Sequence, residues 1–220
     1  MKDIKAIVFD AYGTLFDVNS AAEKCKGKIG DKWEGFANFW RTTQLEYTWL
    51  RSLMKRHKDF WQITEDSLDK SMKAFKIDSS MKSELLNLYK VLSPYPEVKE
   101  VLKKLKEKEC RLAILSNGTP TLLNELVKSN NLENIFDDLF SIEEVRIYKP
   151  DSKVYDMPIK KYQIKADEVA FLSTNTWDVS GGGNYGYNAI WVNRNNNIFD
   201  NLDFKPKSEI NNLTQLLDVV

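Results

Sequence analysis

The alternation of short apolar runs with amphipathic segments constrains this chain most. Four mainly apolar runs lack the polar alternation of half-exposed strands and predict strands covered on both faces: Ile4–Phe9, Leu112–Leu115, Val169–Leu172 and Ala189–Val192. Apolar residues at helical spacing lie over Val98–Leu105 and Thr121–Ser129, before and after the second run. This order predicts an α/β fold with a doubly wound, mostly parallel sheet and helices on both sides.

A long helical segment interrupts the alternation after the first predicted strand. From residue 19 to residue 92 the apolar residues recur at helical spacing, and no convincing strand is found. Two prolines in Ser93–Pro96 end the last helix of this segment. We therefore expect residues 19–92 to form a helical cap inserted into a core of residues 1–18 and 93–220, with a cleft between the two.

Composition excludes several classes of protein. The 32 basic and 32 acidic residues leave no positive excess for binding nucleic acid or an anionic membrane surface. No apolar run approaches the ~20 residues that cross a bilayer, and no secretion signal is found. The spacing of Cys25 and Cys110 suits neither a metal site nor a redox pair, so we expect free, buried or half-buried thiols and a cytoplasmic location.

The chain has a single histidine, His57, in a charged stretch near an expected helix end. This context favours a solvated, helix-capping side chain over a catalytic one. Serine hydrolase triads and histidine-based zinc sites are therefore disfavoured.

Polar residues follow the predicted strands where a parallel sheet binds its ligands, beyond the carboxyl ends. Asp10–Thr14 follow the first strand, Ser116–Gly118 the second and Ser173–Asp178 the third. Lys149 comes just before a helix expected to begin near Asp151. Each segment alone is compatible with an ordinary turn or helix cap. Together they predict one site with two carboxylates, a lysine, hydroxyls and amides.

These segments resemble the four ordered motifs of the haloacid dehalogenase superfamily: Asp10–Leu15, Ser116–Gly118, Lys149–Asp151 and Ser173–Asp178. Trp40–Arg41 and Gln44–Met54 resemble a stretch typical of its 2-haloacid dehalogenases that act on the L enantiomer. The resemblance extends from Ile4 to Phe199. It implies a Rossmann-like catalytic core with a cap, no cofactor, no metal ligands and a homodimer.

Tyr12 separates two branches of that superfamily. Its phosphatases generally carry a second aspartate two residues after the nucleophile, where this chain has a tyrosine. A phenol with a pKa near 10 is a poor acid–base group at neutral pH and adds an apolar wall. Tyr12 therefore favours chemistry on a small organic halide, although simple packing is its alternative use.

The expected chemistry begins at Asp10. An ionised carboxylate can displace halide from carbon 2 of a haloacid, and water can then hydrolyse the ester at its carbonyl. We expect Asp178 to orient or deprotonate this water, and the Lys149 ammonium to compensate the two carboxylates. Thr14 could donate to Asp10 or the substrate, or cap the next segment.

The resemblance implies roles for further residues. Those with implied catalytic roles are Arg41, Ser116, Tyr155, Ser173 and Asn175. Those implied to contact substrate are Ala11, Tyr12, Arg41, Leu45, Phe60, Ser116, Asn117 and Trp177. In a predicted helix over residues 39–55, Arg41 lies on an otherwise apolar stripe, so it faces either the cleft or an acidic partner.

Three features depart from the family pattern. Thr42 stands where relatives often have glutamine. Gly181–Gly183 allow close backbone approach but predict a less rigid turn after Asp178. Pro158 predicts a kink in the helix that carries Tyr155, which weakens the expectation that Tyr155 supports catalysis.

The leading hypothesis is hydrolysis of short L-2-haloalkanoic acids to D-2-hydroxy acids, with inversion at carbon 2 through an ester on Asp10. One alternative is a magnesium-dependent phosphatase of the same superfamily, which would release phosphate rather than halide. The other is a non-catalytic binding protein that retains the cleft.

Overall fold

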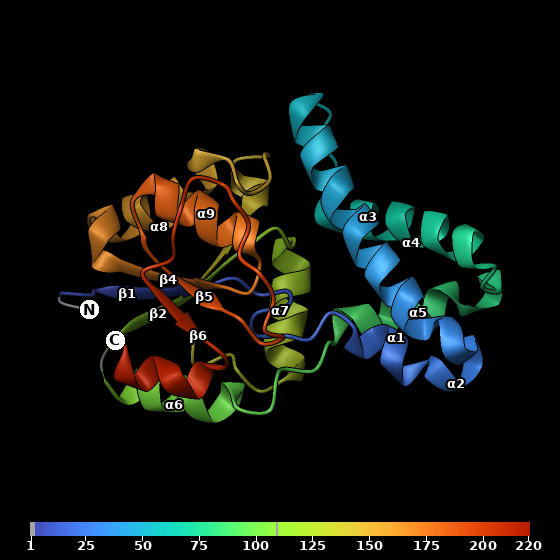
Figure 1. Ribbon diagram of the computed structural model, residues 1–220, viewed down its shortest axis with the longest axis horizontal. Coiled ribbons are helices and arrows are strands. Elements are labelled where there is room, and N and C mark those ends of the chain that lie inside the picture. Colours follow the sequence, from blue (N-terminus) through green and yellow to red (C-terminus); the bar gives the residue numbers. More distant parts are fainter. Residues whose placement is uncertain (1–2, 109) are drawn as a thin grey trace.

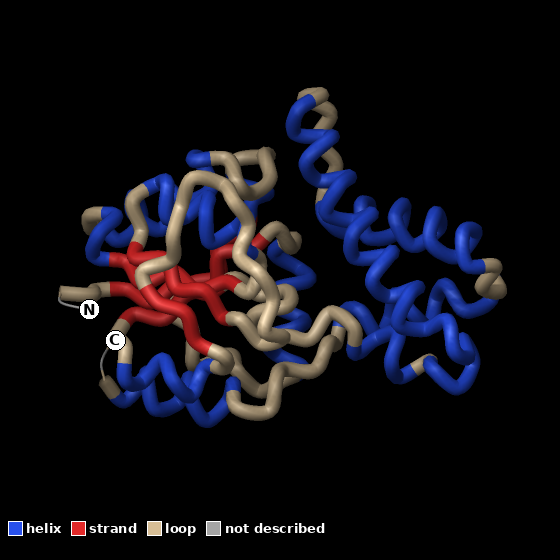
Figure 2. The backbone as a smooth tube through the Cα atoms, in the orientation of Figure 1, coloured by secondary structure: helices blue, strands red, loops and turns tan. Residues whose placement is uncertain are grey.

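The structure is a computed structural model that describes residues 3–108 and 110–220. Residues 1, 2 and 109, which belong to the predicted core, lie outside the described residues. Figure 1 shows two parts: a sheet flanked by helices, and a lobe made of α1 to α5. All the strands belong to the first part, and the lobe contains only helices and loops (Figure 2).

The sheet has six parallel strands in the order β3-β2-β1-β4-β5-β6. Their bounds are β1 (Ala6–Phe9), β2 (Arg111–Ser116), β3 (Asp138–Ser141), β4 (Val169–Ser173), β5 (Asn188–Val192) and β6 (Ser208–Ile210). Four of these coincide with the predicted strands, and all residues of β1 and β4 are buried. The predicted fold class is therefore confirmed.

Helices cover both faces of this sheet: α6 (Val98–Glu107), α7 (Pro120–Ser129), α8 (Ser152–Tyr162) and α9 (Thr176–Tyr185). In Figure 1, α8 and α9 lie on one side of the sheet and α6 on the other. The predicted helices before and after β2 correspond to α6 and α7. Shorter 3-10 helices are η3 (Ile142–Glu144), η4 (Ala166–Glu168) and η5 (Leu213–Asp218).

The helical lobe comprises residues 20–90. Its helices are α1 (Ser20–Lys24), α2 (Lys26–Ile29), α3 (Trp33–Leu53), α4 (Phe60–Phe75) and α5 (Lys82–Lys90), with the 3-10 helices η1 (Gly30–Lys32) and η2 (Ser79–Met81). The helix predicted over residues 39–55 is α3, which begins earlier and ends at Leu53. The Trp40 indole donates to the carbonyl of Thr64 at 3.1 Å and fixes α3 against α4.

Two chain crossings join the lobe to the sheet. The amide of Asp17 donates to the carbonyl of Ser93 at 2.9 Å, and the amide of Tyr95 donates to the carbonyl of Leu15 at 3.0 Å. The segment that leaves the sheet and the segment that returns to it are thus hydrogen-bonded to each other shortly after β1. The exact limits of the cap stay a prediction.

Not one helix of the described residues combines the length and apolar character that a membrane crossing requires. Both cysteines are free, with Cys25 buried and Cys110 partly buried, as predicted.

The prediction of a solvated, helix-capping His57 is wrong. His57 lies in the loop after α3, and its side chain is only 14% exposed. Its Nε2 lies 2.9 Å from a carboxylate oxygen of Glu143, in the sheet part of the molecule. The loop folds back toward the sheet, which the local charge pattern does not reveal.

Candidate active site

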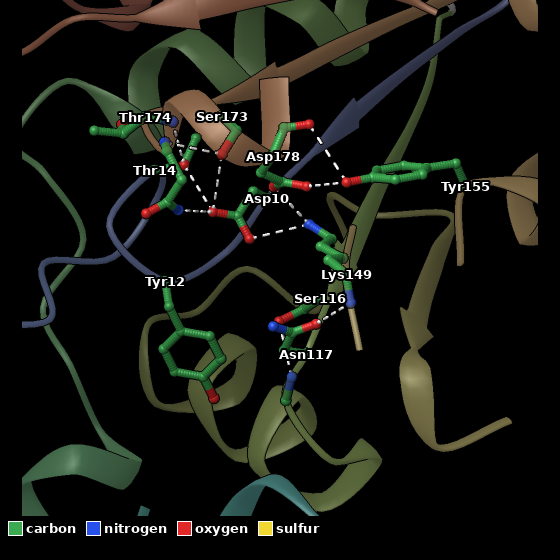
Figure 3. A network of polar contacts seen from close by, with 12 residues as sticks. Asp10, Tyr12, Thr14, Ser116, Asn117, Lys149, Tyr155, Ser173, Thr174 and Asp178 are labelled. Atoms are coloured by element: carbon green, nitrogen blue, oxygen red, sulfur yellow. Dashed lines mark hydrogen bonds and ion pairs between the residues drawn. The ribbon is translucent and has the colours of Figure 1, made fainter. Parts of the chain in front are cut away.

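The strand register brings the predicted polar segments to one edge of the sheet. Phe9, the last residue of β1, pairs with Ile114 of β2 and with Leu172 of β4. The residues that follow, Asp10 and Ser173, are therefore neighbours, and the amide of Asp10 donates to the carbonyl of Leu172 at 2.8 Å. Figure 3 shows the polar side chains that gather at this edge.

Donors from this chain surround the Asp10 carboxylate. Its Oδ2 accepts hydrogen bonds from the Thr14 hydroxyl at 3.0 Å, the Asn175 amide at 3.0 Å and the Ser173 hydroxyl at 3.3 Å. Its Oδ1 lies 3.2 Å from Nζ of Lys149. Asp10 is 6% exposed, and these four contacts fix the position of its carboxylate. The Asp10 carboxylate is therefore held in one position with limited solvent access.

Lys149 bridges the two carboxylates of the site (Figure 3). Its Nζ lies 3.2 Å from Asp10 and 2.9 Å from Asp178, and its side chain is 1% exposed. Burial alone lowers the pKa of Lys149, but the two carboxylates raise it more, so its net pKa lies above the ordinary value. The ammonium therefore stays charged and compensates both acids.

Asp178 lies in the first turn of α9, so the predicted Ser173–Asp178 loop includes the start of that helix. Its Oδ2 faces Lys149, and its Oδ1 accepts a hydrogen bond from the Tyr155 hydroxyl at 2.7 Å. Burial raises the pKa of Asp178 to about 6 against the opposing effect of Lys149, and the charge of Asp10 adds to the rise. A carboxylate with this pKa can accept a proton near neutral pH.

Two of the predicted departures have different structural consequences from those expected. Pro158 lies inside α8, which runs without interruption from Ser152 to Tyr162, and Tyr155 still reaches Asp178. The predicted turn at Gly181–Gly183 is wrong, because these residues lie within α9. A Cβ on Gly181 would come within 2.5 Å of the Tyr155 hydroxyl oxygen, so the missing side chain allows this contact.

Aromatic rings of the helical lobe pack against Tyr12, which follows β1. Its ring stacks on Tyr89 of α5 with centroids 5.7 Å apart, and it lies 5.3 Å from the ring of Phe60 of α4. Burial raises the pKa of Tyr12 well above its ordinary value. The phenol is therefore an apolar surface rather than an acid or base at neutral pH.

Arg41 of α3 reaches the loop that follows β1. Its Nη2 donates to the carbonyl of Tyr12 at 3.3 Å, and its Nη1 donates to the side chain of Gln44 at 2.9 Å. The partners are neutral, so of the two possibilities left by the sequence Arg41 faces the boundary between lobe and sheet rather than an acid. Neutral partners leave the guanidinium charge available to an anion.

The remaining residues predicted to contact substrate differ in how deeply they are buried. The Ser116 hydroxyl accepts from the amide of Gly118 at 3.1 Å, and the Asn117 side chain accepts from the amide of Lys149 at 3.2 Å. Ala11 is buried in the turn after β1, and Leu45 and Trp177 are partly buried. The last departure, Thr42, has an exposed side chain.

Two supporting residues were not found from the sequence. Gln44, 1% exposed, holds Arg41 and also donates to the Tyr89 hydroxyl at 3.0 Å. Its spacing of three from Arg41 on one helix could have revealed it. Tyr89 lies 77 positions after Tyr12, on which it stacks, and no local pattern indicates that contact.

Comparison with known proteins agrees with this geometry. The family model for haloacid dehalogenase-like hydrolases matches residues 4–186. The chain belongs to this family. The chain is 40% identical to (S)-2-haloacid dehalogenase 1 of Pseudomonas sp. (strain CBS-3), over 99% of this chain and 98% of that protein. It is 38% identical to (S)-2-haloacid dehalogenase 4A of Burkholderia cepacia, over 97% and 93% of the two chains.

A solved structure of the same family has closely similar geometry. The L-2-haloacid dehalogenase of Xanthobacter autotrophicus with chloropropionic acid covalently bound has a TM-score of 0.88 and 32% identity, with 98% of each chain covered. The predicted membership of the haloacid dehalogenase superfamily is confirmed.

Proposed function

We propose that this hydrolase acts on the carbon–halide bond of short L-2-haloalkanoic acids and forms D-2-hydroxy acids. The observation that carries the proposal is a buried Asp10 and Asp178 bridged by Lys149, with Tyr12 where phosphatases carry an aspartate. The (S)-2-haloacid dehalogenases that match nearly the whole chain support it.

In the first step, Asp10 attacks carbon 2 of the substrate from the side opposite the halogen. A C–O bond forms, the carbon–halogen bond breaks, and the halide leaves with the bonding electrons. Attack from the rear inverts carbon 2. The covalently bound chloropropionic acid in the Xanthobacter autotrophicus structure supports an ester intermediate.

In the second step, water attacks the carbonyl carbon of the Asp10 ester. Asp178 accepts a proton from this water, because it is the base adjacent to Asp10 and has a raised pKa. The bond between the Asp10 carbonyl carbon and the ester oxygen then breaks, and Asp178 returns its proton to the departing alkoxide. The hydroxy acid leaves with the oxygen that came from Asp10. The second proton of water passes to solvent as Asp10 becomes ionised again. Lys149 stabilises negative charge on both carboxylates throughout.

We assign substrate recognition to groups that border Asp10. Arg41 and the segment Ser116–Asn117 supply donors for the substrate carboxylate and the departing halide. Tyr12, Phe60, Leu45 and Trp177 supply apolar surface for the carbon chain, and Ala11 lines the turn beside Asp10.

The reaction as proposed uses no metal ion. Both oxygens of Asp178 already face donors of this chain, the Lys149 ammonium and the Tyr155 hydroxyl. Lys149 supplies the positive charge between the carboxylates. Tyr12 offers no carboxylate that could protonate a phosphate leaving group.

We further propose the organisation that the family resemblance implies. Residues 19–92 form a cap over a catalytic core of residues 1–18 and 93–220, and the enzyme is a cytoplasmic homodimer. Exposed Leu50, Leu53 and Met54 at the end of α3 supply apolar surface for a second copy. Light scattering should then give twice the chain mass of 25.6 kDa.

Halide release from L-2-chloropropionate, without added metal, tests the proposed activity. We expect stoichiometric chloride and D-lactate from the wild type, and neither from Asp10→Asn, which keeps the size of the side chain but loses the nucleophile. Absence of chloride above that control contradicts the proposal. Phosphate release from p-nitrophenyl phosphate that EDTA abolishes would instead identify a phosphatase.

A further inference from the structure

A hollow with a strongly basic lining lies between the end of α3 and the segment before α8. It has a volume of about 510 Å³, and among its lining residues are Arg51, Lys55, Arg56, Arg146 and Lys153. No acidic residue of the described chain is among those that line it. We call this feature the basic hollow.

Most of these positive charges have no partner. Within residues 3–108 and 110–220, the exposed side chains of Lys55, Arg56, Arg146 and Lys153 make no ion pair or hydrogen bond. Arg51 pairs with Asp66 at 3.1 Å, and His57, which also lines the hollow, lies 2.9 Å from Glu143. The whole chain has equal numbers of acidic and basic residues, 32 each. The positive potential of the basic hollow is therefore a local feature, and it attracts anions.

Another hollow beside the lobe has the opposite charge. Its volume is about 400 Å³, and Asp59, Glu125, Glu143 and Lys90 are among the residues that line it. Three carboxylates against one ammonium repel an anion. The two hollows at the boundary between the lobe and the sheet thus differ in the sign of their charge.

The basic hollow adjoins an apolar pocket that Lys149 helps to line. Ser52 and Ile147 line both the hollow and a pocket of about 390 Å³. Trp49, Lys149 and the acidic Asp151 also line this pocket. The ring of Trp49 packs edge-on against Trp177, with centroids 5.4 Å apart. A small anion with an apolar tail would leave the basic hollow along Trp49 toward Lys149.

We propose that the basic hollow is a binding site for short carboxylate anions, through which the 2-haloacid reaches Asp10. This inference rests on the proposed function for its substrate. The carboxylate binds the guanidinium and ammonium groups first, and the halogen-bearing carbon then enters the apolar pocket. The local concentration of substrate beside the site rises as a result.

The test compares charge reversals of equal size. Arg146→Glu/Lys153→Glu changes the hollow, and Lys99→Glu/Lys103→Glu makes a similar change on exposed residues of α6, across the sheet from α8 (Figure 1). At an ionic strength of about 0.01 M, where the Debye length is about 30 Å, we expect kcat/KM for L-2-chloropropionate to fall about tenfold only in the hollow variant. Its kcat should stay within about twofold of wild type, because the charges act before the chemical steps.

Salt and a neutralised variant sharpen the test. Near 0.15 M, where the Debye length is about 8 Å, the difference between the two variants should shrink severalfold. For Arg146→Gln/Lys153→Gln, kcat/KM should lie between the value of the wild type and that of the charge-reversal variant. Equal kcat/KM and equal salt dependence in both reversal variants would overturn the proposal.

A binding measurement separates this inference from the proposed function. Trifluoroacetate, followed by its ¹⁹F resonance, is an unreactive carboxylate probe, and its binding should weaken about tenfold in the hollow variant alone. If trifluoroacetate binding weakens in the hollow variant alone but the wild type releases no halide, the anion-binding site is supported and the proposed activity is contradicted. If halide is released but trifluoroacetate binding is equal in both variants, the anion site fails. Displacement of the probe by far lower concentrations of inorganic phosphate would identify a phosphate site and overturn the carboxylate assignment.

Discussion

At the scale of single residues, the site depends on one ammonium between two buried carboxylates. Lys149 lies within 3.2 Å of Asp10 and 2.9 Å of Asp178. The sequence predicted this compensation from charge alone, because two nearby carboxylates need a cation. It left two uses open for Thr14, and the hydroxyl makes the first of them, a hydrogen bond to Asp10. The amide from which it accepts, at 2.9 Å, is that of Thr174, 160 positions later, rather than one in the segment that follows Thr14.

The raised pKa of Asp178 predicts an acidic limb in the pH profile. Burial raises this pKa to about 6, so below that pH the carboxyl is protonated and cannot accept a proton from water. We expect kcat for halide release to fall about tenfold per pH unit below a pKa of at most about 6, because the neutral ester removes the Asp10 charge that raises the pKa of Asp178, and to be level above it. A profile that stays flat down to pH 4 would remove Asp178 from the base role.

Tyr155→Phe tests the direction in which the acidic limb of the pH profile moves. The Tyr155 hydroxyl donates to Asp178 and lowers its pKa, so loss of that hydroxyl should raise the pKa and move the limb to higher pH. The measurement is the kcat profile of the variant beside the wild type. A shift toward lower pH would contradict the assigned hydrogen bond.

At the scale of elements, α9 shows where sequence reasoning fails. Three consecutive glycines predict a flexible turn, since each costs about 0.5–1 kcal/mol in a helix relative to alanine. The helix forms because neighbouring rings pack closely on it: a Cβ on Gly182 would lie 2.7 Å from Phe171. Such contacts join distant segments and leave no local signal.

Gly181→Ala tests this packing. The new Cβ would lie 2.5 Å from the Tyr155 hydroxyl oxygen and 2.7 Å from Cβ of Pro150. We expect the free energy of unfolding to fall by about 1–3 kcal/mol. We also expect kcat to fall, because the new Cβ displaces the Tyr155 hydroxyl that donates to Asp178.

Gly27→Ala in α2 is the matched control, because a Cβ there meets nothing within 4 Å. It should leave kcat unchanged and raise the free energy of unfolding by up to about 1 kcal/mol. Thermal melts and halide release measure both variants. Equal effects of the two substitutions would refute the close-packing explanation.

The polarity of the strands explains which of them the sequence reveals. Four strands were predicted because they are continuous apolar runs, whereas β3 and β6 were not. β3 is as long as β1, with four residues, but it begins at Asp138 and ends at Ser141, so its apolar run is only two residues. β6 has three residues, of which Ser208 and Glu209 are polar. Pairing with β2 and β5 defines them, and that pairing is a tertiary property.

At the scale of the molecule, a few contacts join the loop after α3 to the segment that carries Lys149. The Tyr148 hydroxyl donates to the carbonyl of Lys58 at 2.6 Å, and His57 pairs with Glu143. These partners are 90 and 86 positions apart, so the sequence could predict two parts and a cleft but not the contacts across it. The Tyr148 contact joins the loop after α3 to the residue that directly precedes Lys149.

Tyr148→Phe tests that contact. One hydrogen bond of this kind contributes about 0.5–1.5 kcal/mol, so amides of the loop over residues 54–59 should exchange hydrogen about 2- to 10-fold faster. Tyr47→Phe in α3 is the control, because that hydroxyl makes no hydrogen bond within the described residues. Unchanged exchange in the Tyr148 variant would show that the contact does not hold the lobe.

The central claim is that Asp10 bonds covalently to carbon and that water then attacks the Asp10 carbonyl. A single turnover of L-2-chloropropionate with excess enzyme in ¹⁸O-water tests it directly, followed by mass spectrometry of the peptide that contains Asp10 and of the lactate. We predict ¹⁸O in the Asp10 carboxylate and none in the hydroxyl of the lactate. Label in the lactate hydroxyl, with an unlabelled Asp10 peptide, would contradict the account.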